Sequence, residues 1–303
     1  MKLDQLRYFL ETARHGHIGK ASNILSISPS AISHSIAGLE EELGRELFLK
    51  KGKNIVLTSH GKLLMERARK LLQDVDAVKD EVASDCVELQ GHYRLAGAHL
   101  LSSRFLAPAW TKIQNENPRL SAEIYSMRSA GVVAAAASGE FDFGLCLNPQ
   151  PHPGISAMSI YSGQLVIVVN KRHPLLGLDK AKRVAALSRY SACLPKAFSG
   201  VDNCESHPNF EKYGIVPHVR CAFDSYDVAV ENVASSQAWG LMPCWVLRSH
   251  KDRLAPIVPR GWDAPVHAFA VWPKNRLLTK ALKRLIDGIR ERFKSLPEFR
   301  KAA

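Results

Sequence analysis

The chain has 303 residues, of which 46% are hydrophobic and 23% are charged, and its formal net charge is +12. This length exceeds what one ordinary hydrophobic core serves and predicts two or three domains, while the excess of cations favours a nucleic acid as partner. The longest apolar runs, at 132–137 and 165–169, are far shorter than the ~20 residues that span a bilayer. Because residues 1–7 also lack the apolar core of a secretory signal, we expect a cytoplasmic protein that does not enter a membrane.

The positive charge is unevenly distributed along the chain. Residues 1–70 carry 12 Lys/Arg against 7 Asp/Glu, residues 71–90 carry 1 against 6, and residues 91–303 carry 28 against 16. Net charge alone would therefore place a nucleic-acid-binding domain in the C-terminal part, so that domain must be located from local sequence pattern.

The cysteines are scattered without a Cys-x-x-Cys pair, which favours reduced thiols and predicts no zinc site, disulfide framework or other cofactor. They are Cys86, Cys146, Cys193, Cys204, Cys221 and Cys244.

Residues 4–44 predict three helices in succession. Asp4 is the expected N-cap of the first helix, and Gly16 its end. The second helix spans 18–25, and the third begins with Ser28 as N-cap and Pro29 at the first helical position, where the missing N–H costs nothing, and stops at Gly44. The expected buried positions recur at helical spacing: Leu6, Phe9, Leu10, Ala13, Ala21, Ile24, Leu25, Ile32, Ile36, Leu39 and Leu43.

Two short helices joined by the tight turn at 26–28 are typical of a helix-turn-helix, in which the second helix enters the major groove. The predicted DNA-binding residues of that helix are Ser28, Pro29, Ser30, Ser33 and His34. The segment 50–54 then links two β-prone pieces and predicts a hairpin wing whose lysines, Lys50, Lys51 and Lys53, meet phosphates. The alternative, a three-helix module that binds another protein, is disfavoured by these lysines.

The residue types and their spacing in this segment resemble the DNA-binding signature of the LysR family of bacterial transcription regulators. The resemblance is carried by Leu6-Arg7-Tyr8-Phe9, Ala21, Leu25, Ser28, Ala31, Ser33, Ile36, Leu39-Glu40, Leu43-Gly44, Leu47-Phe48, Leu57-Thr58 and Gly61. It implies a winged helix-turn-helix over residues 1–58 that binds double-stranded promoter DNA. The family usually has Gln-Pro where this chain has Pro29-Ser30, and often Arg where it has His34. Because Gln and Arg are the better bidentate base readers, we hypothesise that specificity depends more on phosphate contacts and DNA shape.

Residues 59–90 predict a long helix without proline. Apolar residues recur four and three apart along it and form a narrow seam of the coiled-coil type: Leu64, Ala68, Leu71, Val75, Val78 and Val82. Such a seam calls for a partner helix, and the resemblance implies an antiparallel pairing of two subunits, in a homodimer or homotetramer. The alternative is a helix that packs on its own chain.

Residues 91–303 predict alternating strands and helices. The expected strands are 93–98, 122–127, 141–147, 164–170, 190–194, 216–223, 240–243 and 267–272, and the expected helices are 102–114, 131–138, 203–213, 225–235 and 275–295. Successive βαβ units predict parallel sheets with right-handed crossovers. The predicted fold is thus two α/β, Rossmann-like subdomains after an all-α winged helix-turn-helix and a linker helix. This region resembles the effector-binding domain of LysR regulators, which is similar to periplasmic binding proteins.

Ligands in such sheets bind at the carboxyl ends of strands, near helix N-termini. From this rule, the expected effector-binding residues are His99, Leu100, Leu101, Ser102, Ser103, Arg128, Ser129, Ala130, Asn148, Lys196, Phe198, Ser199, Ser225 and Tyr226. Each serine has the alternative role of a plain helix cap. His99, Arg128 and Lys196 favour an anionic effector. The expected consequence of binding is a change in DNA bending and in the access of RNA polymerase.

Two further classes of protein compete with this interpretation. Cys193 and Cys204 lie where peroxide-sensing LysR relatives carry their reactive pair, so a redox sensor is an alternative that predicts an accessible thiol of low pKa. A solute-binding protein or an enzyme is a remote one, because the sequence has no G-x-S-x-G, G-x-G-x-x-G, P-loop or H-E-x-x-H motif. The basic C-terminal residues from Arg284 to Lys301 are either a solvated helix face or a contact to phosphates.

Overall fold

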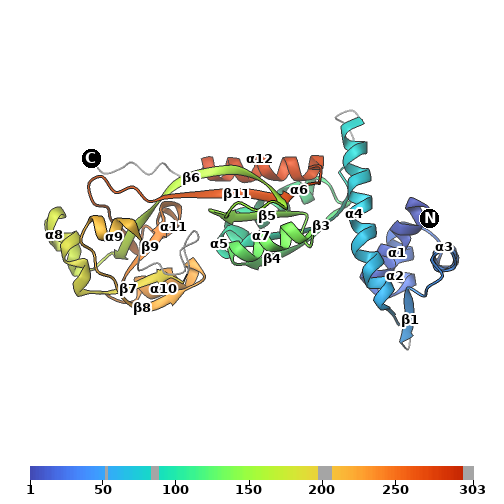
Figure 1. Cartoon of the computed structure of the whole chain (residues 1–303), viewed down its shortest axis with the longest axis horizontal. Helices are drawn as coiled ribbons and strands as arrows, with labels where there is room; N and C mark the ends of the chain where they lie inside the picture. The colour runs from blue at the N-terminus through green and yellow to red at the C-terminus, as the bar shows by residue number, and fades with distance from the viewer. Residues whose placement is uncertain (52–53, 83–88, 197–206, 296–303) are drawn as a thin grey trace. The chain divides into compact units, whose positions relative to one another are not determined.

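The computed structural model describes residues 1–51, 54–82, 89–196 and 207–295. The chain divides into two compact units, one of Met1–Val87 with Leu277–Lys280 and the other of Glu88–Arg276 with Ala281–Ala303. Figure 1 shows helices α1 to α4 and a small hairpin in the first unit, and sheets with flanking helices in the second. Each unit has its own buried core.

The first unit begins with three helices, α1 (Leu3–His15), α2 (Ile18–Leu25) and α3 (Pro29–Leu43). The predicted ends are confirmed, because Gly16 and Gly44 take the left-handed conformation with φ of 59° and 64°. The predicted N-cap Asp4 is wrong. The helix begins two residues earlier, with Lys2 as its N-cap, and the side chain of Gln5 accepts the backbone N–H of Lys2 at 2.7 Å, which leaves Asp4 in the first turn.

The core of this unit confirms most of the predicted apolar stripes. Leu6, Phe9 and Leu39 form one cluster with Leu47, Ala68 and Leu72, and Ala21, Ile32 and Ile36 form another. Two expected members are wrong, because Ile24 is 55% and Leu43 is 42% exposed. In α2 the buried face is set by Ala21 and Ser22, so Ile24 falls on the other side of the helix. Leu43 occupies the last position of α3, a full turn past Leu39.

The predicted wing is a two-stranded antiparallel hairpin of β1 (Phe48–Lys51) and β2 (Asn54–Leu57). Its turn, 52–53, lies outside the described residues. The carboxylate of Glu40 on α3 accepts the N–H groups of Leu47 and Phe48 at 2.7 and 3.2 Å, and so fixes the start of the wing to α3.

Helix α4 (Ser59–Val82) follows the wing, and its apolar seam is divided between two tasks. Ala68, with Leu64 beside it, packs into the core of its own unit together with Leu72. Leu71 and Val78 remain 42% and 52% exposed. The prediction of one continuous intersubunit seam is therefore wrong for its first half, because α1 covers that part of the helix. The side chain of Val82 lies outside the described part.

The second unit contains two α/β lobes, as predicted. The sheet of the first lobe has the order β4-β3-β5-β11, in which β3 (Gly91–Ala98), β4 (Leu120–Met127) and β5 (Phe143–Leu147) are parallel and β11 (Pro265–Pro273) is antiparallel to β5. Its helices are α5 (His99–Leu101), α6 (Ala107–Glu116) and α7 (Ser129–Ser138). The last helix, α12 (Lys280–Lys294), lies along the strands that join the lobes (Figure 1), with Phe293 stacked on Tyr161.

The second lobe has the strand order β8-β7-β9-β6, with β10 on the other edge of β6. Its strands are β6 (Ile155–Asn170), β7 (Ser191–Pro195), β8 (His218–Phe223), β9 (Trp239–Pro243) and β10 (Leu254–Ile257), and its helices are α8 (Lys180–Ala185), α9 (Pro208–Lys212), α10 (Tyr226–Ala234) and α11 (Cys244–Ser249). Strand β6 pairs with β11 in the first lobe and continues into the second, and β11 returns. The sequence predicted this crossing, but not α8, α11, β10 or the first half of β6.

Candidate functional site

The exposed start of α3 carries the residues that the sequence assigned to DNA. Ser28, Pro29, Ser30, Ser33 and His34 are all exposed. Ser28 has a structural task as well, because its Oγ accepts the N–H of Ala31 at 3.2 Å and lies 3.1 Å from the Oγ of Ser30. Ser33 and His34 are therefore the polar side chains best placed to leave the helix surface and reach another molecule.

The wing adds cations to the same unit. Lys50 and Lys51 are exposed at the end of β1, and Lys53 lies outside the described residues. Because the register pairs Lys51 with Asn54, the lysines belong to the tip of the hairpin. A hairpin with exposed lysines at the end of β1 is suited to a phosphate backbone, which it would hold without reading sequence.

In the second unit, the carboxyl ends of strands from both lobes meet. Strands β3, β4 and β5 end next to His99, Arg128 and Asn148, and the second lobe contributes Lys196 after β7 and the turn after β8. Helix α5 of the first lobe lies against α10 of the second. The predicted loops from the two lobes therefore face each other.

The clearest link between these loops is an ion pair that the sequence analysis did not foresee. Arg128 Nη2 donates to Asp224 Oδ2 at 3.1 Å, and the two side chains are about half exposed. The hydrogen bond from Arg128 holds the pKa of Asp224 below its usual range, and the charge of His99 contributes in the same direction. Asp224 directly follows β8, so the strand-end rule that selected Ser225 could also have selected it.

The serines of the candidate effector site already have partners within the first lobe. Ser129 Oγ accepts the N–H of Leu147 at 3.1 Å, and the buried Ser102 donates to the carbonyl of Tyr125 at 3.4 Å. Ser103 donates to the carbonyl of Leu100 at 3.3 Å. Ser129 and Ser102 therefore fasten the ends of β5 and β4, and the alternative role as helix caps is wrong for these serines, because the N-caps of α5 and α7 are Ala98 and Arg128.

The remaining predicted residues differ in what they offer a ligand. Lys196 and Ala130 are exposed. The side chains of Leu100 and Leu101 are buried, and Asn148 exchanges hydrogen bonds with the backbone of His267 at 2.7 and 2.9 Å. On the second lobe, the side chain of Ser225 makes no cap hydrogen bond, and the ring of Tyr226 lies 5.2 Å from that of Phe223. Phe198 and Ser199 lie outside the described residues.

The helix that carries His99 and Ser102 contains a wide turn. The predicted helix 102–114 begins three residues earlier, and Ser102–Leu106 forms a π-helical turn before α6. Pro108 has no N–H to donate to the carbonyl of Arg104, so the regular series of α-helical backbone hydrogen bonds is interrupted there. The Nε of Arg292 on α12 donates to this carbonyl at 3.3 Å instead.

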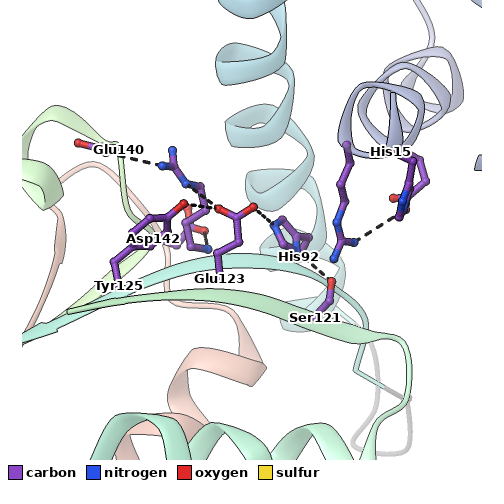
Figure 2. A network of polar contacts seen from close by, with 10 residues as sticks. His15, His92, Ser121, Glu123, Tyr125, Glu140 and Asp142 are labelled. Atoms are coloured by element: carbon purple, nitrogen blue, oxygen red, sulfur yellow. Dashed lines mark hydrogen bonds and ion pairs between the residues drawn. The ribbon is translucent and has the colours of Figure 1, made fainter. Parts of the chain in front are cut away.

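A second polar cluster, shown in Figure 2, lies at the opposite end of the same sheet. Arg94 lies between Glu123 and Glu140 at 3.5 and 3.6 Å, and its guanidinium carbon is 5.2 Å from the ring centre of Phe141. Asp142 accepts the N–H of Arg94 and pairs with the buried Arg276. These contacts join β3, β4 and the start of β5, so the cluster serves the fold and not the predicted effector site.

The cysteines bear on the redox alternative. Cys193 on β7 is fully buried and faces Cys221 on β8 in the strand register, while Cys204 lies outside the described residues. Burial, and then Cys221, raise the pKa of Cys193. A raised pKa lowers the thiolate fraction on which reactivity depends.

Within the described residues, no group of three His, Cys, Asp or Glu side chains is arranged to hold a metal ion. No helix of that part of the chain is long and apolar enough to cross a membrane.

Comparisons with known proteins agree with this architecture. Residues 3–62 match the family model for the bacterial regulatory helix-turn-helix protein of the lysR family, and residues 87–294 match the LysR substrate binding domain. The transcriptional dual regulator GltC of Bacillus subtilis is 23% identical over 306 residues, which cover 99% of this chain and all of that protein. A probable hydrogen peroxide-inducible genes activator of Mycobacterium xenopi is 30% identical over 57% of this chain and 91% of its own.

Solved structures show the same fold at low sequence identity. A mutant of Corynebacterium glutamicum OxyR superposes with a TM-score of 0.73 at 19% identity, over 97% of this chain and 93% of that one. Full-length CbnR in complex with its target DNA superposes with a TM-score of 0.53 at 22% identity, over 96% and 99%. The substrate-domain model alone covers more than half of the sequence. With its helix-turn-helix and its substrate-binding domain, the chain belongs to the LysR family of transcriptional regulators.

Proposed function

We propose that this regulator senses a small organic anion between the two lobes of its second unit. The observation that carries the proposal is the meeting of strand ends from both lobes at Arg128 and Asp224. Binding closes the lobes around the ligand, shifts the population of conformations and thereby changes DNA bending and the access of RNA polymerase at a promoter. We infer a cytoplasmic protein without catalytic activity.

The class of effector follows from the charges at this edge. His99, Arg128 and Lys196 supply cations or hydrogen-bond donors, and Asp224 is the internal anion that already occupies Arg128. A carboxylate or phosphate that binds Arg128 must exchange with Asp224. The effector therefore replaces an existing interlobe contact, and its binding is coupled to the arrangement of the lobes.

Subunit pairing is proposed for the exposed part of α4. Leu63, Leu71 and Val78 are 56%, 42% and 52% exposed and recur eight and seven residues apart, which places them along one face. Two copies joined through this face form a homodimer with two DNA-reading units, and two such dimers form a tetramer. A dimer addresses two half-sites of an interrupted palindrome.

The first test is retention of sheared genomic DNA by the purified protein at two salt concentrations, followed by sequencing. We expect a few sites that share an interrupted palindrome. The double variant Ser33→Ala/His34→Ala keeps binding but alters the preferred sequence if these side chains read bases, and Glu41→Ala, on an exposed position at the far end of α3, is the matched control. Uniform retention that disappears with salt would show that only phosphates are read, and no retention would contradict the proposed function.

A further inference from the structure

A pocket of 350 Å³ lies on the second lobe, away from the edge where the two lobes meet. It is lined by Lys171, Leu247, Arg248, Lys251, Leu254, Ala255 and Pro256. These residues come from the end of α11, the turn after it, the edge strand β10 and the residue that follows β6. None of them belongs to the strand-end loops of the proposed effector site.

The floor of this pocket is apolar. Leu247 and Leu254 are buried, with only 6% and 2% of their surface exposed, and Ala255 is half-buried. Pro256 stands on the edge strand, where proline is tolerated because no further strand needs its N–H. A volume of this size falls within the range of small-molecule sites, which are predominantly apolar with a few placed polar groups.

The rim of the pocket is cationic. Lys171, Arg248 and Lys251 are the charged lining residues, and the lining contains no carboxylate. The buried Nε of Arg248 has no hydrogen-bond partner among the described residues, while the rest of its guanidinium interacts with the hydroxyl of Tyr161, so the two lysines are the cations that remain for a ligand. The two terminal guanidinium nitrogens of Arg253 donate to the carboxylate of Glu231 at 2.6 and 2.8 Å. Because Glu231 is paired in this way, it does not neutralise the cations of the rim.

From this combination we propose that the pocket binds a small organic anion with an apolar body, such as a medium-chain or aromatic carboxylate. The carboxylate lies at the two lysines, and the hydrocarbon part covers Leu247 and Leu254. The site is separate from the effector site between the lobes, so the proposal does not depend on that one.

The pocket is lined in part by α11, a helix of the second lobe that also contacts the first lobe. On α11, Trp245 lies with its ring 5.3 Å from that of Phe105 in the first lobe. In the turn after α11, His250 Nε2 lies 3.5 Å from Arg104 of the first lobe. A ligand that orders the end of α11 therefore acts on residues that contact both lobes.

The test is isothermal titration of the full-length protein with octanoate, with octanol as the uncharged probe. We expect octanoate to bind at one site per chain that the double variant Lys171→Glu/Lys251→Glu weakens at least tenfold. Lys180→Glu/Lys182→Glu is the matched control, because it makes the same change of charge on exposed positions of α8 in the same lobe, and its affinity stays at the wild-type value.

Two further arms make the result decisive. Ala255→Trp fills the pocket without a change of charge and is expected to abolish the same binding event, while Arg128→Ala leaves it unchanged. Loss of binding in Arg128→Ala alone would place octanoate between the lobes and overturn the proposal. Equal affinity in all variants, no binding to the wild type, or equal binding of octanol would also overturn it.

Discussion

At the scale of single residues, Asp224 is the group whose charge state most directly reports the contact between the lobes. Arg128 holds its pKa below the ordinary value, so the ion pair is present at neutral pH. A carboxylate with a depressed pKa contributes stability above its unfolded pKa and loses it as the pH falls through the folded pKa. The interlobe contact is therefore expected to weaken only in acid.

This expectation can be measured by 13C NMR of the Asp224 carboxyl group during a pH titration. Arg128→Ala removes the donor and is expected to raise the pKa of Asp224 towards its usual range. Arg220→Ala, which removes an exposed arginine from β8 without a contact to Asp224 in the structure, serves as control and leaves the titration unchanged. An unaltered titration in Arg128→Ala would show that the lobes do not meet here in solution.

Cys193 gives a second prediction at this scale. Because burial raises its pKa, the thiol is expected to react with iodoacetamide far more slowly than the half-buried Cys221 at neutral pH. The same shift makes the folded state less favourable above the unfolded thiol pKa of about 8.5, where only the unfolded chain ionises readily. Rapid alkylation of Cys193 in the folded protein would revive the redox alternative.

At the scale of elements, the helices of the first unit show what tertiary packing decides. Phe9 is fully buried in α1, whereas Ile24 in α2 is 55% exposed although both occupy apolar positions of their helices. Phe9→Ala is expected to lower the free energy of unfolding by about 3–5 kcal/mol, because it leaves a cavity. Ile24→Ala is expected to change it by about 0.5 kcal/mol or less. Urea unfolding measures both, and a cost for Ile24→Ala as large as that for Phe9→Ala would show that Ile24 is covered in solution.

The exposed face of α4 gives the second prediction for an element. Leu71→Asp/Val78→Asp places charges on the proposed intersubunit face and is expected to convert the proposed dimer into monomers in sedimentation analysis. Leu178→Asp, at a 40% exposed leucine of the second unit, is the matched control and leaves the dimer intact. A dimer that survives the double variant would place the subunit interface elsewhere.

Several helix ends could be predicted from the sequence because local chemistry determines them. Gly16, Gly44 and the Ser28-Pro29 pair stop or start helices through their own backbone preferences. The division of the α4 seam could not be predicted, since Ala68 is buried only because α1 lies beside it. Helix α11 is six residues long, too short for its periodicity to be recognised.

The candidate site was predicted only in part for the same reason. The strand-end rule located His99, Arg128, Lys196 and Ser225 on loops that the fold brings together. It could not distinguish hydroxyls that fasten the lobe, such as Ser129, from groups that remain for a ligand, because that depends on the partner at Leu147. The ion pair of Arg128 spans 96 positions of sequence, and no local pattern indicates it.

At the scale of the whole second unit, the path of the chain makes the second lobe an insertion within the first. Its entry and exit are neighbours, because Gln164 on β6 pairs with Pro265 on β11. The two lobes are joined through strands that also form the sheets, so a relative rotation bends backbone without breaking a separate linker. This connection suits an arrangement of lobes that a ligand alters.

The same path determines the order in which the protein can be completed during synthesis. Strand β5 pairs on one side with β11, and Leu147 meets Ala268 about 120 residues later. At ribosomal rates this delay is on the order of 10 s, during which the apolar β5 has an open hydrogen-bonding edge. The nascent first lobe is thus exposed to misassociation through this edge until the second lobe has left the ribosome.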